Sequence, residues 1–544
     1  MNGDSFYFSL QYSAIQKTVL RHDRLWSMAG ISQIMAWMNE IEMPRIVKEN
    51  SGSVLVAGGG KFTAKFDNKK KSETAKEEII KLISTTLPML EFQFAEIKSY
   101  KDMVVAREAG IFESLNEQKK RFRGYGVSYN PHFRICPECG EYPSINRPEP
   151  EAKKDKYEYE RTKEFCSICL AAFWKARIEG EGNAEMTTIE RIYKKFFQSE
   201  VFKNINKQFL PEIPLNFKNL FPDEKEKEKG VRMAVWFSDL NSMNQKVPIW
   251  LSQCEDEKED VYSIPRIFSM IKDVNIDIIS ETLAKTFTTP GCKYLPFRLI
   301  VAGGDDLRIV MAEEYIFDFI ENLSGMVEQK IKQINTLPKY IPLSKKWLQE
   351  QANKWAKENQ DNKKEIPKIK SYSFGGSFVV TSLHTPFKKI HEACEEMMSE
   401  AKRKTNREGN SVNWSVLSVE ENPDVKKMLR FEKPLLIEEE YRGKHDNTAR
   451  LSFKQYIAMR NFYSGILSGS HIQQIASKII EFKNDSKQVE DWLKKAASAE
   501  LEKSFAYVLV DKNFRKDRKE DEDFMCERLS TLLELLSISR KGVK

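Results

Sequence analysis

Two carboxylates at the tip of a predicted hairpin are well suited to bind a divalent cation. Residues 298–311 read RLIVAGGDDLRIVM, so Asp305 and Asp306 follow Gly303-Gly304 between two strand-like runs. A Gly-Gly pair in this setting is typical of a tight turn and leaves the backbone open to a large ligand. Mg²⁺ takes one or two protein carboxylates and completes its shell with water and substrate phosphates. The alternative is a solvated hairpin with acidic turn residues.

A third carboxylate is expected beside this hairpin. Residues 234–240 read AVWFSDL and predict a strand in which Asp239 lies near the end. The predicted order of strand, helices, hairpin, helix, strand, helix and strand is that of an elaborated ferredoxin-like fold. The first strand of that fold lies beside the hairpin, so Asp239 should approach Asp305 and Asp306.

Three carboxylates without histidine or cysteine form an oxygen-only site, which suits Mg²⁺ or Mn²⁺ better than Zn²⁺. Two such ions stabilise the attacking hydroxyl and the leaving pyrophosphate of an in-line displacement, which is nucleotidyl transfer. Lys402 and Lys404, on a predicted helix after Pro386, could contact triphosphate oxygens as point charges. The alternative for these lysines is a solvated helix face.

Four cysteines in two C-x-x-C pairs form the strongest local motif. They are Cys136, Cys139, Cys166 and Cys169. Two thiolate pairs make a tetrahedral sulphur cage, and the intervening length is compatible with a structural zinc ribbon. The alternative is four unrelated thiols. The other four cysteines are scattered singly, which is more typical of a reduced compartment than of a disulfide framework.

Composition limits the class of protein. The chain of 544 residues is too long for one core. Its charged share of 31% indicates a solvated surface, and its net charge of +7 permits a nucleic-acid partner without requiring one. No apolar run is long enough for a membrane span, and the first residues do not form a secretory signal. These features predict a cytoplasmic protein with no membrane partner.

An internal repeat is the second strong signal. Residues 54–66 read VLVAGGGKFTAKF, and residues 299–311 read LIVAGGDDLRIVM, so Gly60 and Lys61 stand where the second copy has its acidic pair. A strand near the start ends in Phe8-Ser9-Leu10, which matches Phe237-Ser238-Asp239 and places Leu10 at the position of Asp239. We therefore expect a duplicated domain in which one copy has lost its carboxylates. Chance similarity of two short apolar hairpins is the alternative.

The remaining pattern predicts the elements around these landmarks. Helices are expected at about 186–209, 312–334 and 388–404, with strands within 371–386 and 412–419. An acidic-basic linker ends at Gly230, the lysine-rich stretch 344–370 is expected as an exposed insertion, and 516–523 is expected as a solvated charge run. The chain is expected to be helical from about residue 424.

The ordered set of GGGK at 58–61, four cysteines, Asp239 and GGDD at 303–306 resembles the large polymerase-like subunit of type III CRISPR effector complexes. The resemblance covers nearly the whole chain. It implies an α+β fold with two ferredoxin-like palm domains of the GGDEF and polymerase type. The implied segments are a degenerate first palm (1–128), a four-cysteine zinc module with a helical segment (129–229), a second palm with the GGDD site (230–423) and a C-terminal helical domain (424–544).

The resemblance also implies a reaction, in which target RNA activates the condensation of ATP into cyclic oligoadenylates. The family's metal and catalytic positions carry over to Asp239, Asp305 and Asp306, and its nucleotide contacts to Gly303, Gly304 and Lys402. Implied partners are a small helical subunit, backbone subunits, the 5′ end of a guide RNA and a target RNA. Many members begin with an HD nuclease domain, whereas this chain starts directly at the first palm, so that activity is not expected.

Three other functions stay open at this stage. Some relatives join ATP to S-adenosylmethionine at the same palm site. A freestanding cyclase that makes a cyclic dinucleotide would need two active palms facing each other, which the degenerate first copy disfavours. A non-catalytic RNA-binding scaffold is less attractive, because all three carboxylates remain together in one copy.

Overall fold

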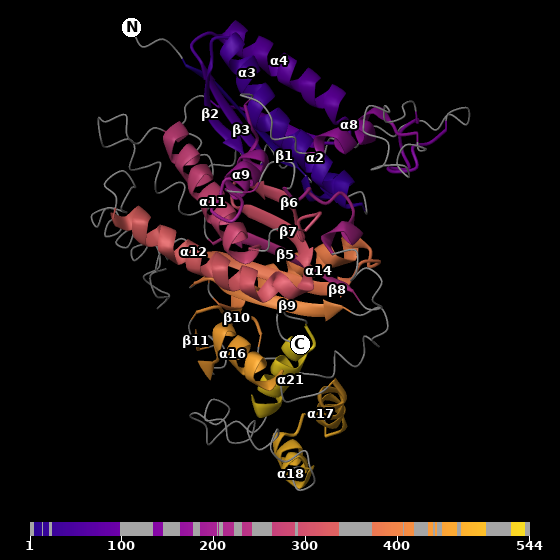
Figure 1. Ribbon diagram of the computed structural model, residues 1–544. Coiled ribbons are helices and arrows are strands. Elements are labelled where there is room, and N and C mark those ends of the chain that lie inside the picture. The colour runs from indigo at the N-terminus through magenta and orange to yellow at the C-terminus, as the bar shows by residue number, and fades with distance from the viewer. Residues whose placement is uncertain are drawn as a thin grey trace, which may run out of the picture.

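The protein is described here from a computed structural model (Figure 1). The structure describes residues 5–13, 15–20, 24–97, 134–144, 164–177, 185–203, 205, 210–221, 231–241, 264–288, 292–336, 373–405, 407, 409–417, 433–438, 441–442, 449–464, 469–482, 484–496 and 524–538. The expected linker ending at Gly230, the insertion at 344–370 and the charge run at 516–523 lie outside these residues. Within the described ranges, no helix has both the length and the apolar character needed to cross a bilayer.

The first sheet is antiparallel and has the strand order β2-β3-β1-β4. Its strands are β1 (Phe6–Ser13), β2 (Ser53–Gly58), β3 (Lys61–Phe66) and β4 (Glu91–Ile97). The helices between β1 and β2 are α1 (Ile15–Val19), α2 (Leu25–Trp37), the π-helical turn η1 (Met38–Glu42) and α3 (Met43–Glu49). Helix α4 (Lys69–Thr86) then connects β3 to β4.

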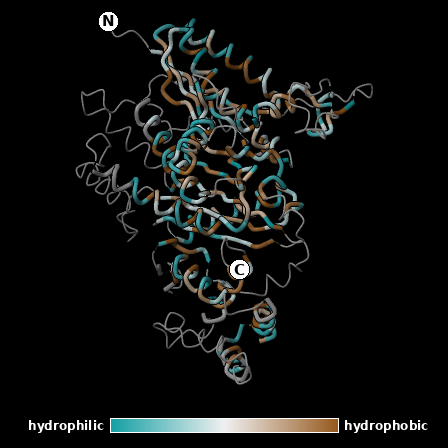
Figure 2. The backbone as a smooth tube through the Cα atoms, viewed as in Figure 1, coloured by the Kyte–Doolittle hydropathy of each residue, from teal (hydrophilic) through white to brown (hydrophobic). Residues whose placement is uncertain are grey.

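Helix α4 illustrates how the sequence determines these elements. The side chain of Asn68 accepts a hydrogen bond from Lys71 N and caps the first turn. Ala75, Ile79 and Ile83, spaced four residues apart, are its buried positions. Figure 2 shows polar and apolar residues alternating along this helix, as expected for one that lies on the surface of the first sheet.

The second sheet has the order β10-β9-β8-β5-β7-β6, in which β8 and β9 are parallel and every other pair is antiparallel. Its strands are β5 (Arg232–Leu240), β6 (Phe297–Gly303), β7 (Asp306–Ala312), β8 (Phe374–Ser382), β9 (Ser411–Leu417) and β10 (Leu435–Leu436). The connecting helices are α11 (Ile264–Thr286), α12 (Ile316–Thr336) and α14 (Phe387–Lys404). Both sheets therefore place their first strand between the second strand of a hairpin and a later strand, and the expected α+β class is confirmed.

The two hairpins match residue by residue, which supports the duplication. In the first hairpin the register shifts between Val54 and Val56, and in the second it shifts between Leu299 and Val301. Positions 54 and 299 correspond in the sequence repeat, so both copies carry a bulge at the same place. A bulge at the same position in both copies is more specific than a shared apolar pattern.

The pairing of β1 corrects one sequence prediction. Leu10 pairs with Phe62, and Gln11 pairs with Lys61, whereas Asp239 pairs with Asp306. Since Lys61 corresponds to Asp306, Gln11 and not Leu10 stands at the position of Asp239. Leu10 is fully buried in the core. Matching the letters Phe-Ser shifted the strand by one residue, and such a shift exchanges the two faces of a strand.

The hydrogen bonds at the hairpin turns give the same alignment. Tyr12 N donates to Gly60 O at 2.8 Å, and Leu240 N donates to Asp305 O at 3.2 Å. Gly60 corresponds to Asp305, so Tyr12 corresponds to Leu240 and Gln11 to Asp239. The first copy has therefore replaced its three carboxylates by Gln11, Gly60 and Lys61.

The four-cysteine segment packs on the first sheet's helical layer. Helix α8 (Ser167–Lys175) lies against α2, and a Cβ added at Gly30 would overlap the backbone carbonyl of Ala172. Glycine is therefore needed at residue 30 for the two helices to approach this closely. Trp26 packs edge-to-face on Phe173, with ring centroids 5.4 Å apart, and fills the same interface.

Helix α9 (Thr188–Phe197) is shorter than the predicted helix at 186–209. Thr187 and Glu190 form a capping box at its start. After Phe197 the chain turns and brings Phe202 against Phe196, with ring centroids 4.9 Å apart, so burial of Phe202 favours the turn over continued helix.

Residues of α8 and α9 cover β6, the edge strand of the second sheet. The Tyr193 hydroxyl accepts a hydrogen bond from Leu299 N at 3.0 Å. The fully buried Arg298 donates to Ala176 O at 2.7 Å, and Ala176 is the C-terminal cap of α8. The expected zinc module is thus joined to the strand that leads to Gly303.

The C-terminal region is mainly helical, as predicted. Its helices are α16 (Phe453–Tyr463), α17 (Gly469–Glu481), α18 (Ser486–Ala496) and α21 (Phe524–Leu536), preceded by the short strands β11 (Tyr441–Arg442) and β12 (Ala449–Arg450). Figure 1 places them below the second sheet. Arg460 donates to the carbonyls of Leu535 and Ile538 at the end of α21, where the helix dipole favours a cation.

Because β10 pairs with β9, the second sheet continues past the expected boundary at residue 423.

The contact between α2 and α8 gives a testable prediction. We expect Gly30→Ala to lower the free energy of unfolding by about 2 kcal/mol, because the added methyl group overpacks a backbone-to-backbone contact. Thermal unfolding would measure the change. Gly325→Ala in α12, where an added Cβ meets no atom within 4 Å, is the matched control and should be neutral or slightly stabilising. Equal unfolding temperatures for Gly30→Ala and wild type would contradict the packing.

Candidate active site

Three carboxylates converge where β5 and the β6–β7 hairpin end. Asp239 on β5 is the direct partner of Asp306 on β7, so their side chains share one face of the sheet. Asp305 lies in the turn, and its carbonyl accepts the hydrogen bond from Leu240 N. The predicted convergence of these residues is confirmed, whereas their catalytic role stays a prediction.

Burial and the repulsion of neighbouring carboxylates make Asp239 and Asp306 difficult to ionise in the absence of a cation. Burial, followed by the charge of Asp305, raises the pKa of Asp239 to about 7, although Lys402 opposes the shift. Burial also raises the pKa of Asp306 to about 6, against the opposing charge of Arg308. Grouped carboxylates with raised pKa values are typical of sites that bind cations or transfer protons.

Lys402 enters this cluster, whereas Lys404 does not. The ammonium of Lys402, on the last turn of α14, forms an ion pair with Asp239 Oδ2. Its side chain is only 11% exposed, which rules out the alternative of a solvated helix face for this residue. Lys404 instead pairs with Glu400 at 2.5 Å, one turn earlier on the helix surface.

A buried arginine behind Asp306 was not predicted from the sequence. Arg308 donates to Glu395 at 2.8 Å and lies 3.3 Å from His391 Nε2, and both of these residues belong to α14. The guanidinium centre also lies 4.7 Å from the Phe237 ring centroid. The sequence signal for this residue was a single charged side chain within the apolar run of a buried strand. Arg308 thus supplies positive charge beside the carboxylates, on the same face of the sheet, while its own charge is matched by Glu395.

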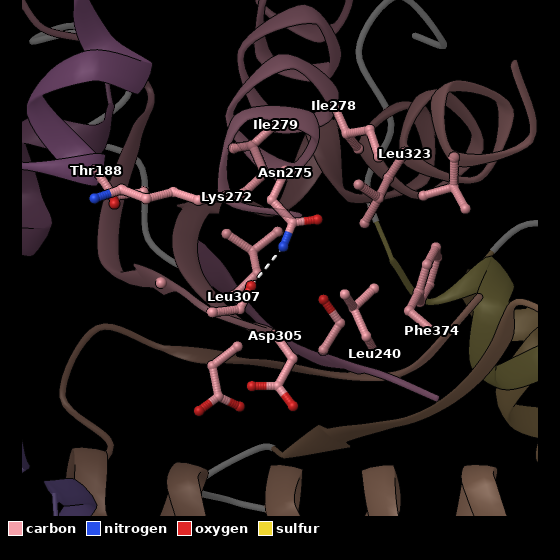
Figure 3. Close-up of a pocket in the computed structure, with 15 residues that line it drawn as sticks. Thr188, Leu240, Lys272, Asn275, Ile278, Ile279, Asp305, Leu307, Leu323 and Phe374 are labelled. Carbon is pink, nitrogen blue, oxygen red and sulfur yellow. Dashed lines mark hydrogen bonds between the residues drawn. The ribbon is translucent and has the colours of Figure 1, made fainter. Parts of the chain in front are cut away.

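The hairpin tip is held from one side and contacted from the other. Gly304 has a φ of +62°, which favours glycine, and its carbonyl accepts a hydrogen bond from the Asn275 amide of α11 (Figure 3). A Cβ added at Gly304 would lie 3.2 Å from Cα of Gly59, the corresponding turn of the first copy. The two hairpins therefore meet tip to tip, a contact between copies that the sequence did not reveal.

A pocket opens beside the hairpin on the side of α11 and α12. Its apolar wall includes Leu240, Ile278, Ile279, Leu323 and Phe374. Polar groups reach it from Thr188, Lys272 and Asn275. Asp305 and Asp306 also line the pocket, and in Figure 3 the carboxylate of Asp305 points away from the apolar wall.

Glu40 joins the two copies at the rim of this pocket. Its nearly buried carboxylate accepts hydrogen bonds from Lys272 at 2.6 Å, from Thr188 N at 2.8 Å and from Thr188 Oγ1 at 2.9 Å. These partners belong to α11 and α9, whereas Glu40 belongs to η1 of the first copy. One side chain therefore links three elements that are distant in the sequence.

The four predicted cysteines come together and fit a zinc ion. Their Sγ atoms all lie within 4.8 Å of one another. A tetrahedral cage with Zn–S bonds of about 2.3 Å has S···S edges of about 3.8 Å, and the Cys139–Cys166 distance is 3.8 Å. Cys136 N donates to Tyr142 O and Gly140 N donates to Cys136 O, which forms the tight loop expected around one C-x-x-C pair. The set could hold a closed, structural zinc site.

Comparisons with known proteins identify the fold. No protein-family model matches the chain, and no curated protein matches its sequence. The crystal structure of Csm1 in T. onnurineus has a TM-score of 0.51 at 11% identity, covering 98% of this chain and 70% of that chain. The apo Csm1–Csm4 cassette has a TM-score of 0.51 at 13% identity, with the same coverage of 98% and 70%. The chain therefore shares the overall fold of Csm1.

The raised pKa of Asp306 predicts a dependence of stability on pH. The folded state binds more protons than the unfolded state between about pH 4 and pH 6, so the free energy of unfolding falls as pH rises through this window. In chelator-treated protein we expect Asp306→Asn to be more stable than wild type by about 2 kcal/mol at pH 8. The gain should shrink steadily as the pH is lowered towards 4.

Denaturant unfolding at several pH values would measure this effect. Asp67→Asn, at an exposed position outside the site, is the matched control. A gain for Asp306→Asn that stays the same at pH 8 and pH 5 would show that burial of its charge is not the cause.

Zinc content and stability should depend on the four cysteines. We expect reduced protein to contain about one zinc ion per chain, and Cys166→Ser to lower both zinc content and unfolding temperature. Metal analysis with thermal unfolding provides the test. Cys292→Ser, at a half-buried cysteine outside the cluster, should retain the metal. Reduced wild-type protein without bound zinc would refute the zinc site.

Proposed function

We propose that the chain is an ATP-using nucleotidyltransferase that works as the large subunit of a type III CRISPR effector complex. The observation that carries this proposal is the selective retention of acids in a duplicated scaffold. Asp239, Asp305 and Asp306 meet at the second hairpin, whereas the matching positions of the first copy are Gln11, Gly60 and Lys61. A structural requirement of the hairpin would affect both copies alike, so the difference supports a chemical role.

The proposed site divides its tasks among neighbouring residues. Asp239, Asp305 and Asp306 would hold two Mg²⁺ or Mn²⁺ ions, which stabilise the attacking hydroxyl and the leaving pyrophosphate when bound. The backbone at Gly303 and Gly304 would contact the phosphates from the side of the turn that does not face Gly59. Lys402 would place a positive charge beside them, and Arg308 adds positive charge from the same face of the sheet, two residues beyond Asp306 on β7.

The apolar pocket provides a place for the nucleobase. Leu240, Ile279 and Phe374 line a cavity next to the hairpin, and such a wall excludes water and stacks well on a flat ring. Asn275 would keep the hairpin tip in place through its bond to Gly304 O. We propose that adenine binds here while the triphosphate extends over the strand ends towards the carboxylates.

The two domains around the site are proposed to be palms of the GGDEF and polymerase type. The strand order of each sheet supports this, because the first strand lies between the hairpin and a later strand as in a ferredoxin-like fold. The proposed segments are the degenerate first palm (1–128), the zinc ribbon module (129–229), the active palm (230–423, extended by β10) and the C-terminal helical domain (424–544).

The proposed partners follow from the shared fold. The apo neighbour is a cassette of Csm1 with Csm4, so a backbone subunit of this kind is a proposed partner of the present chain. A small helical subunit, the 5′ end of a guide RNA and a target RNA complete the proposed assembly. The target RNA would shift the site towards its competent state by binding that state more tightly.

The contact between the hairpins disfavours a freestanding cyclase with two active palms. The place where a second active hairpin would face the first is taken by Gly59 of the same chain. The remaining choice concerns the product. Condensation of ATP into cyclic oligoadenylates and conjugation of ATP to S-adenosylmethionine would use the same carboxylates.

One experiment tests the proposal. The full chain, with its copurifying partners and a complementary target RNA, is incubated with labelled ATP and Mg²⁺ or Mn²⁺, with and without S-adenosylmethionine. We expect target-dependent product that falls at least about 100-fold in the Asp305→Ala/Asp306→Ala variant, because the groups that stabilise the transition state are lost. Asp67→Ala, outside the site, should keep wild-type activity.

The other outcomes have distinct meanings. Product that requires S-adenosylmethionine would assign the same site to conjugation. A cyclic dinucleotide made from GTP without RNA would indicate a freestanding cyclase. RNA binding without any product would leave a scaffold and contradict the proposed enzyme.

A further inference from the structure

A glycine on β8 lies beneath the side chain of Lys402 where that side chain reaches the acidic cluster. Gly375 is the direct partner of Asp239 across the β5–β8 pair. The stem of Lys402 comes from α14 and crosses β8 over this glycine. A Cβ added at Gly375 would overlap Lys402 Cγ and lie 3.0 Å from Cε and 3.2 Å from Cδ. Three consecutive carbons of the lysine stem thus occupy the space that any side chain at residue 375 would need.

The next glycine shows that the requirement at Gly375 belongs to the site. Gly376 faces the opposite side of the sheet, where an added Cβ would overlap the ring of the buried Trp236. Adjacent strand residues point to opposite faces. Gly376 therefore serves core packing, whereas Gly375 serves the face that carries Asp239 and Lys402.

Burial confines the Lys402 ammonium to a small region next to Asp239. The side chain is 11% exposed, its stem is confined by β8, and its ammonium is paired with the partly buried Asp239. An ammonium held against Asp239 occupies the surface of the carboxylate that a divalent cation would need. The lysine and the cation therefore compete for the same carboxylate oxygens.

We propose that Gly375 is a positioning residue whose missing side chain lets Lys402 neutralise Asp239 in the metal-free protein, so that a divalent cation must displace the ammonium to bind. This inference rests on the proposed metal-dependent function and deepens it. The displaced ammonium becomes free to meet the substrate's phosphates, so a single lysine stabilises both the empty and the loaded site.

Binding of Mn²⁺ to the full-length chain tests the competition without measuring activity. We expect Lys402→Met, which keeps the stem and removes the charge, to lower the Kd for Mn²⁺ about fivefold. Gly375→Ala should lower the Kd by a similar factor because it pushes the lysine off Asp239. Titration followed by electron paramagnetic resonance measures the free metal directly.

A double-variant cycle separates positioning from structural damage. In the Lys402→Met background, Gly375→Ala should change the Kd for Mn²⁺ less than twofold, because the charge that it positions is already gone. Product formation, measured in parallel, should show a raised KM for ATP in both single variants. Gly325→Ala, with open space around its added methyl group, is the control for a harmless glycine substitution.

Each contrary result identifies what fails. Weaker Mn²⁺ binding by Lys402→Met or Gly375→Ala would overturn the positioning role while leaving the nucleotidyltransferase intact. The same holds if Gly375→Ala changes the Kd for Mn²⁺ by the same factor in the wild-type and Lys402→Met backgrounds. Wild-type protein that neither binds Mn²⁺ nor forms product would overturn the proposed function and this inference together.

Discussion

The antiparallel pairing of β5 with β7 places Asp239 directly opposite Asp306, and the neighbouring charged residues compensate the repulsion between these two carboxylates. Like charges facing each other across a sheet repel, and burial deprives them of water. Lys402 offsets the repulsion from α14, and Arg308 offsets it from the same face of β7, two residues beyond Asp306. Helix α14 supplies His391, Glu395 and Lys402 along its length, so its docking on the sheet and the charge balance of the cluster are coupled.

The sequence was sufficient for features encoded by short-range patterns. The two Gly-Gly hairpins, the strand carrying Asp239 and the gathering of the cysteines all followed from spacing and turn chemistry. Placing Leu10 at the position equivalent to Asp239 was wrong by one residue, because matching sequence letters does not reveal which backbone hydrogen bonds the end of the strand forms. The bond from Tyr12 N to Gly60 O determines that register.

Features that depend on distant packing could not be predicted in this way. Glu40 is an ordinary acidic residue in the sequence, yet it accepts hydrogen bonds from two helices far along the chain. Gly59 resembles any turn glycine, yet its Cα lies against Gly304. Such contacts arise because the two copies face each other hairpin to hairpin. The first copy therefore packs against the turn that carries the acids, and this close contact explains why its own turn keeps a glycine at residue 59.

The residues that cover the edge strand β6 also affect how the protein behaves in solution. An edge strand presents unpaired peptide groups, which recruit strands from other molecules when they are bare. Here Tyr193 accepts one of these N–H groups, and Arg298 ties the end of α8 to the same strand. Cys166 of the cysteine cluster caps the N-terminus of α8, so loss of the proposed zinc ion would loosen the covering helix as well as the cluster. With the proposed zinc bound, the cysteine module would also protect the chain from self-association, and preparations stripped of the metal would aggregate before they unfold.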